Sequence, residues 1–275
     1  MLVGIVCALS VLSAVLTCLG SGAFETLRWL WVLPVTAVGT FLGLALLWFL
    51  LMFVMSKLVK MDRQQEKDDP FYRGVLYWTI GALIPLLRVK IRTRGLEKTP
   101  KTGRFLLVCN HLNDTDPVVL LHCFRKSQLA FISKRENDRK FIVGPFLRQI
   151  LCQPINREND REALKTILRC IQLLKDDLVS VGVFPEGYVS LDRLLHPFRA
   201  GVFKIAQKAK VPIVVCTLRD THHIFPNAMK LKPTEVELRL LDVIPAQELE
   251  GVTAVQIAER VHKMMADDLG PELVL

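Results

Sequence analysis

The chain has 275 residues, of which 51% are hydrophobic, and its mean hydropathy is +0.32. This is too apolar for an ordinary soluble domain, so the composition predicts a membrane segment. The formal net charge is +9, which favours anionic surfaces and phosphate-bearing ligands. Glu25 and Arg28 are the only charged residues before residue 57. The whole excess of positive charge therefore lies in residues 57–275. Because a membrane tether would hold this part near a bilayer, lipid is a better partner for it than nucleic acid.

Two uncharged stretches, 1–24 and 29–56, open the chain. The 28 residues of the second stretch would form a helix roughly 42 Å long, which crosses a hydrocarbon core of about 30 Å with some tilt. We predict a two-helix membrane anchor over 1–56, with a turn over 20–22. A secretory signal peptide over 1–19 is the alternative, although no basic region precedes the apolar run. Basic residues after the second helix predict that the rest of the chain lies on the cytoplasmic face of the cell membrane.

A linker with an interfacial segment is predicted over 57–87. Residues 74–87 carry no charge but are too few to span a bilayer. Their aromatic side chains suit either the membrane interface or a protein core, and both interpretations stay open.

From residue 88 onward, short apolar or alternating segments are interleaved with helical patterns. Strands are predicted over 89–94, 105–109, 129–133, 180–184, 211–218 and 235–244. Helices are predicted over 117–124, 159–177, 199–210 and 253–269. This alternation predicts one α/β domain over 88–275, with a mixed, largely parallel sheet flanked by helices.

Two of these helices have clear end signals and an apolar face. Asn159 and Glu162 are spaced as in a capping box. Apolar residues at helical spacing indicate the first of these helices: Leu164, Ile167, Leu168, Ile171 and Leu174. Val255 is expected on the packed side of the closing helix.

The stretch LVCNHLNDTDPV places Asp116 five residues after His111. Positions five apart do not face each other in a strand or a straight helix, so a turn over 113–115 must bring the two side chains together. Asp116 is also expected to be the N-cap of the helix over 117–124. The residues alone leave open whether this is an acid–base pair or a helix cap with an ordinary strand end.

Four further residues follow predicted strands or precede helices. Lys134 and Arg157 are candidate phosphate contacts, with a surface lysine and a solvated loop arginine as the plain alternatives. Glu186 and Gly187 follow a strand directly, where a glycine lets a ligand approach the backbone closely; a simple turn is the alternative.

Nothing in the sequence indicates a metal site. Seven cysteines are scattered without a C-x-x-C pair, so we expect reduced, partly buried thiols rather than zinc ligands. The pair His222–His223 has no recognisable constellation around it and is interpreted as structural.

Four segments occur in an order that resembles the PlsC-type glycerolipid acyltransferases, the 1-acyl-sn-glycerol-3-phosphate acyltransferase family. NHLNDTD resembles the Asn-His-x4-Asp block, INR the second block, FPEG the third and VPIV the fourth. The resemblance covers roughly 88–245, and the apolar hairpin ahead of it fits the membrane habit of the family. It implies an acyltransferase domain over 88–275.

The resemblance also implies a reaction. His111 takes the proton from a hydroxyl of lysophosphatidic acid, Asp116 orients the imidazole, and the oxygen attacks the thioester of acyl-CoA or acyl carrier protein to give phosphatidic acid. Arg157 grips the phosphate of this lysophospholipid, and Glu186 and Gly187 belong to the acceptor site. The thioester is a co-substrate, so no cofactor is expected. No acyl-enzyme is needed, so Cys109 is expected to be a packing residue.

The third block departs from the family pattern. Tyr188 and Val189 stand where Thr-Arg usually follows Glu-Gly, so an arginine is missing, and Arg193 or Arg199 is a candidate substitute. The departure keeps two alternatives open. One is the same chemistry on another acceptor, such as glycerol 3-phosphate or a lyso-aminolipid. The other is a membrane-bound lipid-binding protein without catalysis.

Overall fold

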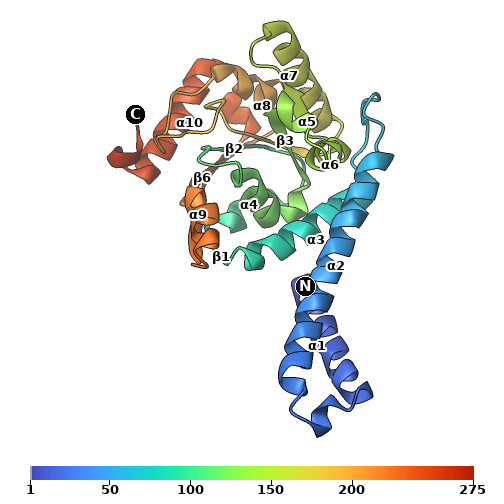
Figure 1. The fold of residues 1–275 in the computed structure, drawn as a ribbon. Coiled ribbons are helices and arrows are strands. Elements are labelled where there is room, and N and C mark those ends of the chain that lie inside the picture. Colours follow the sequence, from blue (N-terminus) through green and yellow to red (C-terminus); the bar gives the residue numbers. More distant parts are fainter. Residues whose placement is uncertain (1) are drawn as a thin grey trace.

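The computed structural model describes residues 2–275 and begins with a helical hairpin. Helix α1 (Leu2–Gly20) and helix α2 (Trp29–Leu58) pack side by side and extend away from the rest of the molecule (Figure 1). The connection turns at Gly22, whose φ of 62° lies in the left-handed region that favours glycine. Both helices are long and apolar enough to cross a membrane, and most of their surface is exposed. The predicted hairpin and its turn are confirmed.

Most of the segment after the hairpin is helical rather than an extended linker. Helix α3 (Pro70–Leu86) begins at Asp69, whose carboxylate accepts hydrogen bonds from two backbone N–H groups of the first turn. Its inner side buries Tyr77 and Ile80 in the core, while Trp78 and Leu86 are exposed on the outside. The core interpretation therefore holds for one side of this helix.

A seven-stranded sheet forms the centre of the described chain, in the order β1-β7-β6-β2-β5-β3-β4. The strands are β1 (Val89–Arg94), β2 (Leu106–Cys109), β3 (Leu129–Lys134), β4 (Gln153–Ile155), β5 (Ser180–Val183), β6 (Ile213–Arg219) and β7 (Thr234–Ile244). Neighbouring strands are parallel except for β6 and β7, which run antiparallel. The predicted mixed, largely parallel sheet is confirmed.

Helices cover both faces of this sheet (Figure 1). They are α4 (Asp116–Cys123), α5 (Arg135–Asp138), α6 (Val143–Gln149), α7 (Asp160–Lys175), α8 (Lys204–Ala209), α9 (Ile224–Met229) and α10 (Ala254–Leu269). Side chains of β2 alternate between two buried cores, because Leu107 and Cys109 pack towards α3 and α4 while Leu106 and Val108 pack towards α7, α8 and α10. The parallel central strands are thus buried on both faces.

Two details of helix α7 stand out against the sequence pattern. Asn159 caps α7 by accepting from the backbone N–H of Glu162, but the Glu162 carboxylate binds Asn156 and Arg135 instead of closing a capping box. Of the apolar residues that indicated this helix, Ile171 and Leu174 are buried, whereas Leu164 and Leu168 are exposed. That face is turned outward because the helix buries the neighbouring stripe, which includes Cys170 and Leu174.

Two other helical segments also deviate from the prediction. Val255 is exposed in the first turn of α10, whereas Ile257, Val261 and Met265 are buried as expected. The helix predicted over 199–210 starts as a 3-10 turn and becomes α-helical only at Lys204.

Candidate active site

The residue after β2 is fixed to a neighbouring strand. Asn110 donates from its side-chain amide to the carbonyl of Leu218 at 3.0 Å and accepts from the N–H of Leu218 at 2.8 Å. Asn110 is itself buried, so this pair of bonds ties the carboxyl end of β2 to that of β6. His111 therefore starts from a rigid position at the edge of the sheet where α/β proteins bind their ligands.

The structure brings His111 and Asp116 together. The distance from Nδ1 of His111 to Oδ2 of Asp116 is 2.8 Å. Asn113 makes the required turn, since its carbonyl accepts from the N–H of Asp116 and its side chain accepts from the N–H of Thr115. The Asp116 side chain is fully buried, whereas 12% of the His111 side chain is exposed.

The sequence suggested that Asp116 is the N-cap of α4, but the structure shows otherwise. Thr115 holds that position and Asp116 is the first helical residue. Its carboxylate turns back along the chain and accepts from the N–H groups of Leu112 at 2.6 Å and Asn113 at 2.8 Å. The aspartate therefore orders the turn that carries the histidine instead of capping the helix that follows.

This bonding sets the roles of the two imidazole nitrogens. An ionised carboxylate only accepts hydrogen bonds, so Nδ1 of His111 donates and Nε2 carries the free electron pair in the neutral ring. The ring is stacked on Phe184, with the centroids 4.0 Å apart and an interplanar angle of 14°. Phe184 is in turn stacked on Phe131, so the imidazole plane is held from one side.

Glu186 joins the same network. Its Oε1 accepts from the backbone N–H of His111 at 2.9 Å, and the carbonyl of His111 accepts from the N–H of Ser190 at 2.8 Å. Burial raises the pKa of Glu186 to about 7, against the opposing effect of that N–H bond. Glu186 Oε2 is buried without a hydrogen-bond partner in residues 2–275.

The two candidate phosphate contacts lie at the ends of neighbouring outer strands. Lys134 ends β3, where it is paired in register with Ile155, two residues before Arg157. The Lys134 ammonium is exposed and lies 3.5 Å from the carboxylate of Glu136. Burial, followed by the charge of Arg199, lowers the pKa of Arg157.

Cys109 is placed as expected for a packing residue. It is fully buried in β2, and burial raises the pKa of its thiol well above the usual value. A thiol that resists ionisation is a poor nucleophile. All seven cysteines of the described chain are free.

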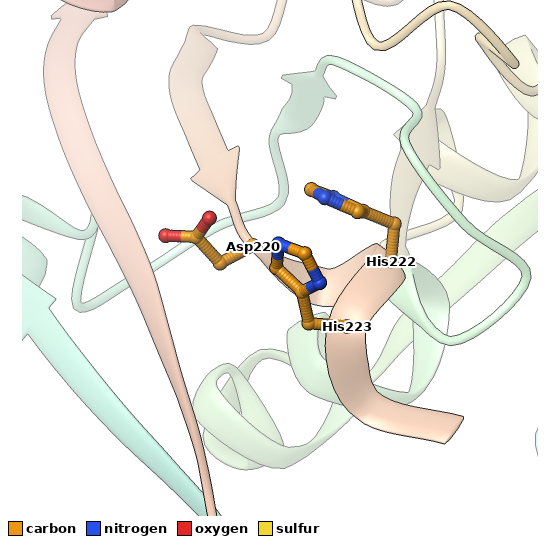
Figure 2. A group of neighbouring side chains, drawn as sticks. All are labelled: Asp220, His222 and His223. Atoms are coloured by element: carbon orange, nitrogen blue, oxygen red, sulfur yellow. The ribbon is translucent and has the colours of Figure 1, made fainter. Parts of the chain in front are cut away.

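One group of side chains offers metal-ligand atoms. Asp220, His222 and His223 follow β6 (Figure 2), and a ligand atom from each lies within 4.8 Å of the others. Both ring nitrogens of His222 are buried without a hydrogen-bond partner in the described part of the chain. Ligand atoms about 2.0–2.2 Å from a tetrahedral zinc ion are closer together, roughly 3.3 Å apart, so an ion would require these side chains to close in. The expectation of no metal site stays a prediction.

Sequence reasoning missed three contacts of His111 and its strand. Asn110 stands within the first block and Ser190 lies three residues after the third, so a polar residue in or near a block was the available signal. Phe184 gave no such signal, because its stacking on the imidazole depends on the path of the loop after β5.

Comparison with known proteins was made against this geometry. The sequence model of the family described as Acyltransferase matches residues 90–219. A 1-acyl-sn-glycerol-3-phosphate acyltransferase of Chlamydomonas reinhardtii is 31% identical over 230 residues, covering 82% of this chain and 66% of the algal protein. Enzymes of the same name from Brassica napus chloroplasts and Haemophilus influenzae are 32% and 26% identical, over 60% and 72% of this chain and 46% and 81% of theirs.

The chain thus spans between about half and two thirds of the length of the algal and plant relatives. The fold is also found in the crystal structure of the 1-acyl-sn-glycerophosphate acyltransferase PlsC from Thermotoga maritima. The TM-score is 0.61 at 23% identity, covering 80% of this chain and 87% of that one. Together, the family match and these relatives show that the chain belongs to the PlsC-type acyltransferase family.

Proposed function

We propose that this chain transfers a fatty acyl group from acyl-CoA or acyl carrier protein to the free hydroxyl of lysophosphatidic acid, giving phosphatidic acid in phospholipid synthesis. One observation carries the proposal: Nδ1 of His111 lies 2.8 Å from Oδ2 of the buried Asp116, which leaves Nε2 as the free base of a partly exposed ring. The relatives are named for the same reaction.

In the proposed reaction, Nε2 of His111 takes the proton of the acceptor hydroxyl as its oxygen attacks the thioester carbonyl. The new C–O ester bond forms, the C–S bond breaks, and the proton passes from the imidazolium to the departing thiolate. Asp116 balances the positive charge of the imidazolium. General-base help of this kind is typically worth about 10²–10⁴ in rate.

In this proposal the acceptor is held beyond β5, on the side of β3 and β4 rather than on the side of β2 and His111. We assign Arg157 to its phosphate, with Lys134 as a second cation farther out. Glu186 fixes the backbone of His111, and Gly187 makes the turn after β5, where its φ of 85° favours glycine. The thioester is a co-substrate, so the reaction needs no cofactor.

The site works at a membrane in this proposal. Helices α1 and α2 are apolar enough to enter a bilayer, where both the lysophospholipid and the product reside. The basic residues that follow α2 put the catalytic domain on the cytoplasmic face. We divide the chain accordingly into an anchor over 1–56, a connecting segment over 57–87 and a catalytic domain over 88–275.

The altered third block favours one second candidate, the same acyl transfer to glycerol 3-phosphate or a lyso-aminolipid. The test is to incubate the purified full chain in detergent with acyl-CoA or acyl carrier protein thioester as donor and each acceptor in turn, and to identify the products by mass spectrometry. Phosphatidic acid formed from lysophosphatidic acid supports the proposal. If another acceptor is acylated and lysophosphatidic acid is not, the second candidate replaces it; if none is acylated with either type of donor, the chain binds lipid without catalysis.

A further inference from the structure

No cation directly follows the third block of this chain. Val189 follows Tyr188 directly after Glu186-Gly187 and is partly buried. A valine offers no charge to a phosphate group, although the proposed acceptor site adjoins Gly187. Another cation must supply that charge if the acceptor is a phosphate monoester.

Arg199 lies directly against Gly187. Its backbone N–H donates to the carbonyl of Pro185 at 2.8 Å, which brings the segment after the block back beside it. A Cβ atom built on Gly187 would lie 2.8 Å from Nε and 3.0 Å from Cδ of Arg199. The arginine side chain therefore crosses over the glycine, and it occupies the space that any larger residue at 187 would need.

Arg157 follows β4, and Gly187 follows β5; both strands pair in parallel with β3, so the two residues lie beyond the same edge of the sheet. The charge of Arg199 contributes to the lowered pKa of Arg157, so the two guanidinium groups are close enough to repel each other. Glu136 offsets part of this repulsion, but its carboxylate is paired with Lys134 at 3.5 Å. Within residues 2–275, neither guanidinium has a hydrogen-bond or ion-pair partner.

Arg193 is the other candidate in the same loop, and it lies elsewhere. Its charge lowers the pKa of His222, which follows β6. In the sheet, β2, β5 and β3 separate β6 from β4, the strand that leads to Arg157. Arg193 thus belongs to the opposite side of the site.

We propose that Arg199 supplies the second guanidinium of the acceptor site in this chain, so that a phosphate monoester is bound between Arg157 and Arg199. The inference rests on the proposed function and adds a residue to it. A phosphate monoester carries close to two negative charges, and two guanidinium forks match its oxygens with several charge-assisted hydrogen bonds. An anion between these groups also removes their mutual repulsion, which gives the bare site its affinity for phosphate.

The test compares Arg199→Ala with Arg193→Ala, a matched control that removes the same charge from the same loop. We expect Arg199→Ala to raise the KM for lysophosphatidic acid by about 10- to 100-fold, with a smaller change in kcat. Arg193→Ala should leave the KM within about threefold of wild type. Equal values of KM for wild type and Arg199→Ala would overturn the inference.

Two further variants keep the result interpretable. Arg199→Gln retains most of the stem that packs over Gly187 but has no charge, so a properly folded Arg199→Gln protein should show the same rise in KM. Arg199→Lys restores one positive charge without the fork, and an intermediate KM is expected. If Arg199→Gln binds lysophosphatidic acid as tightly as wild type does, the charge is not used and the inference fails.

A binding measurement separates this inference from the proposed reaction. Lysophosphatidic acid is titrated into the His111→Ala protein with and without Arg199→Gln, and the dissociation constants are compared. Weaker binding in the double variant supports the phosphate role whatever the catalytic outcome. Unchanged binding contradicts it, while failure of wild type to acylate lysophosphatidic acid counts against the proposed function alone.

Discussion

The surroundings of His111 and those of Gly187 differ in how completely their polar groups are bonded. Around His111, three donors converge on Oδ2 of Asp116, and both backbone polar groups of the histidine have partners. The second carboxylate oxygens of Asp116 and Glu186 are buried without a partner in residues 2–275. Around Gly187, the two guanidinium groups of Arg157 and Arg199 have no partner in the described chain. The difference indicates that the groups assigned to proton transfer are fixed before substrate arrives, whereas those assigned to charge recognition are left for an anion to complete.

The strongest test of the hydrogen-bonded groups around His111 is the substitution Asp116→Asn. The amide keeps an acceptor for the turn that carries His111 but has no charge to stabilise the imidazolium. We expect kcat to fall by about 10²-fold or more, with a small change in KM for lysophosphatidic acid. The measurement is steady-state kinetics at saturating acyl-CoA, with thermal unfolding as the control. A kcat within threefold of wild type would show that this charge is dispensable.

Glu186→Gln tests a second member of the hydrogen-bonded groups around His111, through the pH dependence of stability. The pKa of this carboxyl is about 7 in the folded chain against an ordinary value of 4.5, so the folded state holds the proton more tightly. The protonated form thus favours folding at low pH, and this contribution is lost as pH rises from about 4.5 to about 7. We expect the loss to be on the order of a few kcal/mol.

The corresponding measurement is the unfolding temperature of wild type and Glu186→Gln in detergent at pH 5 and pH 8. The glutamine variant should gain stability relative to wild type as the pH rises. A constant difference between the two proteins over this range would mean that burial does not perturb the titration of Glu186.

The smallest effect is expected for Cys109→Ala, because Cys109 lies near His111 without taking part in its hydrogen bonds to Asp116 and Glu186. Cys109 is two residues from His111 but is fully buried and resists ionisation. We expect kcat to stay within about twofold of wild type, with some loss of stability from the small cavity. Loss of acyl transfer in a stably folded Cys109→Ala protein, together with a trapped acyl-thioester, would instead indicate a covalent intermediate.

The sequence predicted the elements with strong periodic signals. Six of the strands, the apolar hairpin and the helix after Asn159 lie where alternation, uncharged length or a cap residue placed them. Strand β4 was missed because its three residues, Gln153–Ile155, are too few for an alternating pattern and include a proline. Leu164 and Leu168 are apolar and periodic, yet only the packing of α7 on the sheet decides which side is covered.

In the candidate site, too, features with a local sequence signal were predicted and features set by tertiary packing were not. The turn formers between His111 and Asp116 predicted that the two side chains meet, because only a turn can join positions five apart. The role of Asp116 at the helix start was wrong, since no sequence rule tells whether a carboxylate turns forward to its own helix or back to the preceding turn. The approach of Arg199 to Gly187 joins residues 12 positions apart through an irregular loop, which has no periodic pattern.

The account depends most on the imidazole of His111 acting as the base. The direct measurement is the single-turnover rate of acyl transfer from acyl-CoA to lysophosphatidic acid by wild type and His111→Ala, with both substrates saturating. We predict a fall of about 10²–10⁴-fold in a variant that unfolds at nearly the same temperature and still binds lysophosphatidic acid. A folded His111→Ala protein that transfers the acyl group within a few-fold of the wild-type rate would contradict the account.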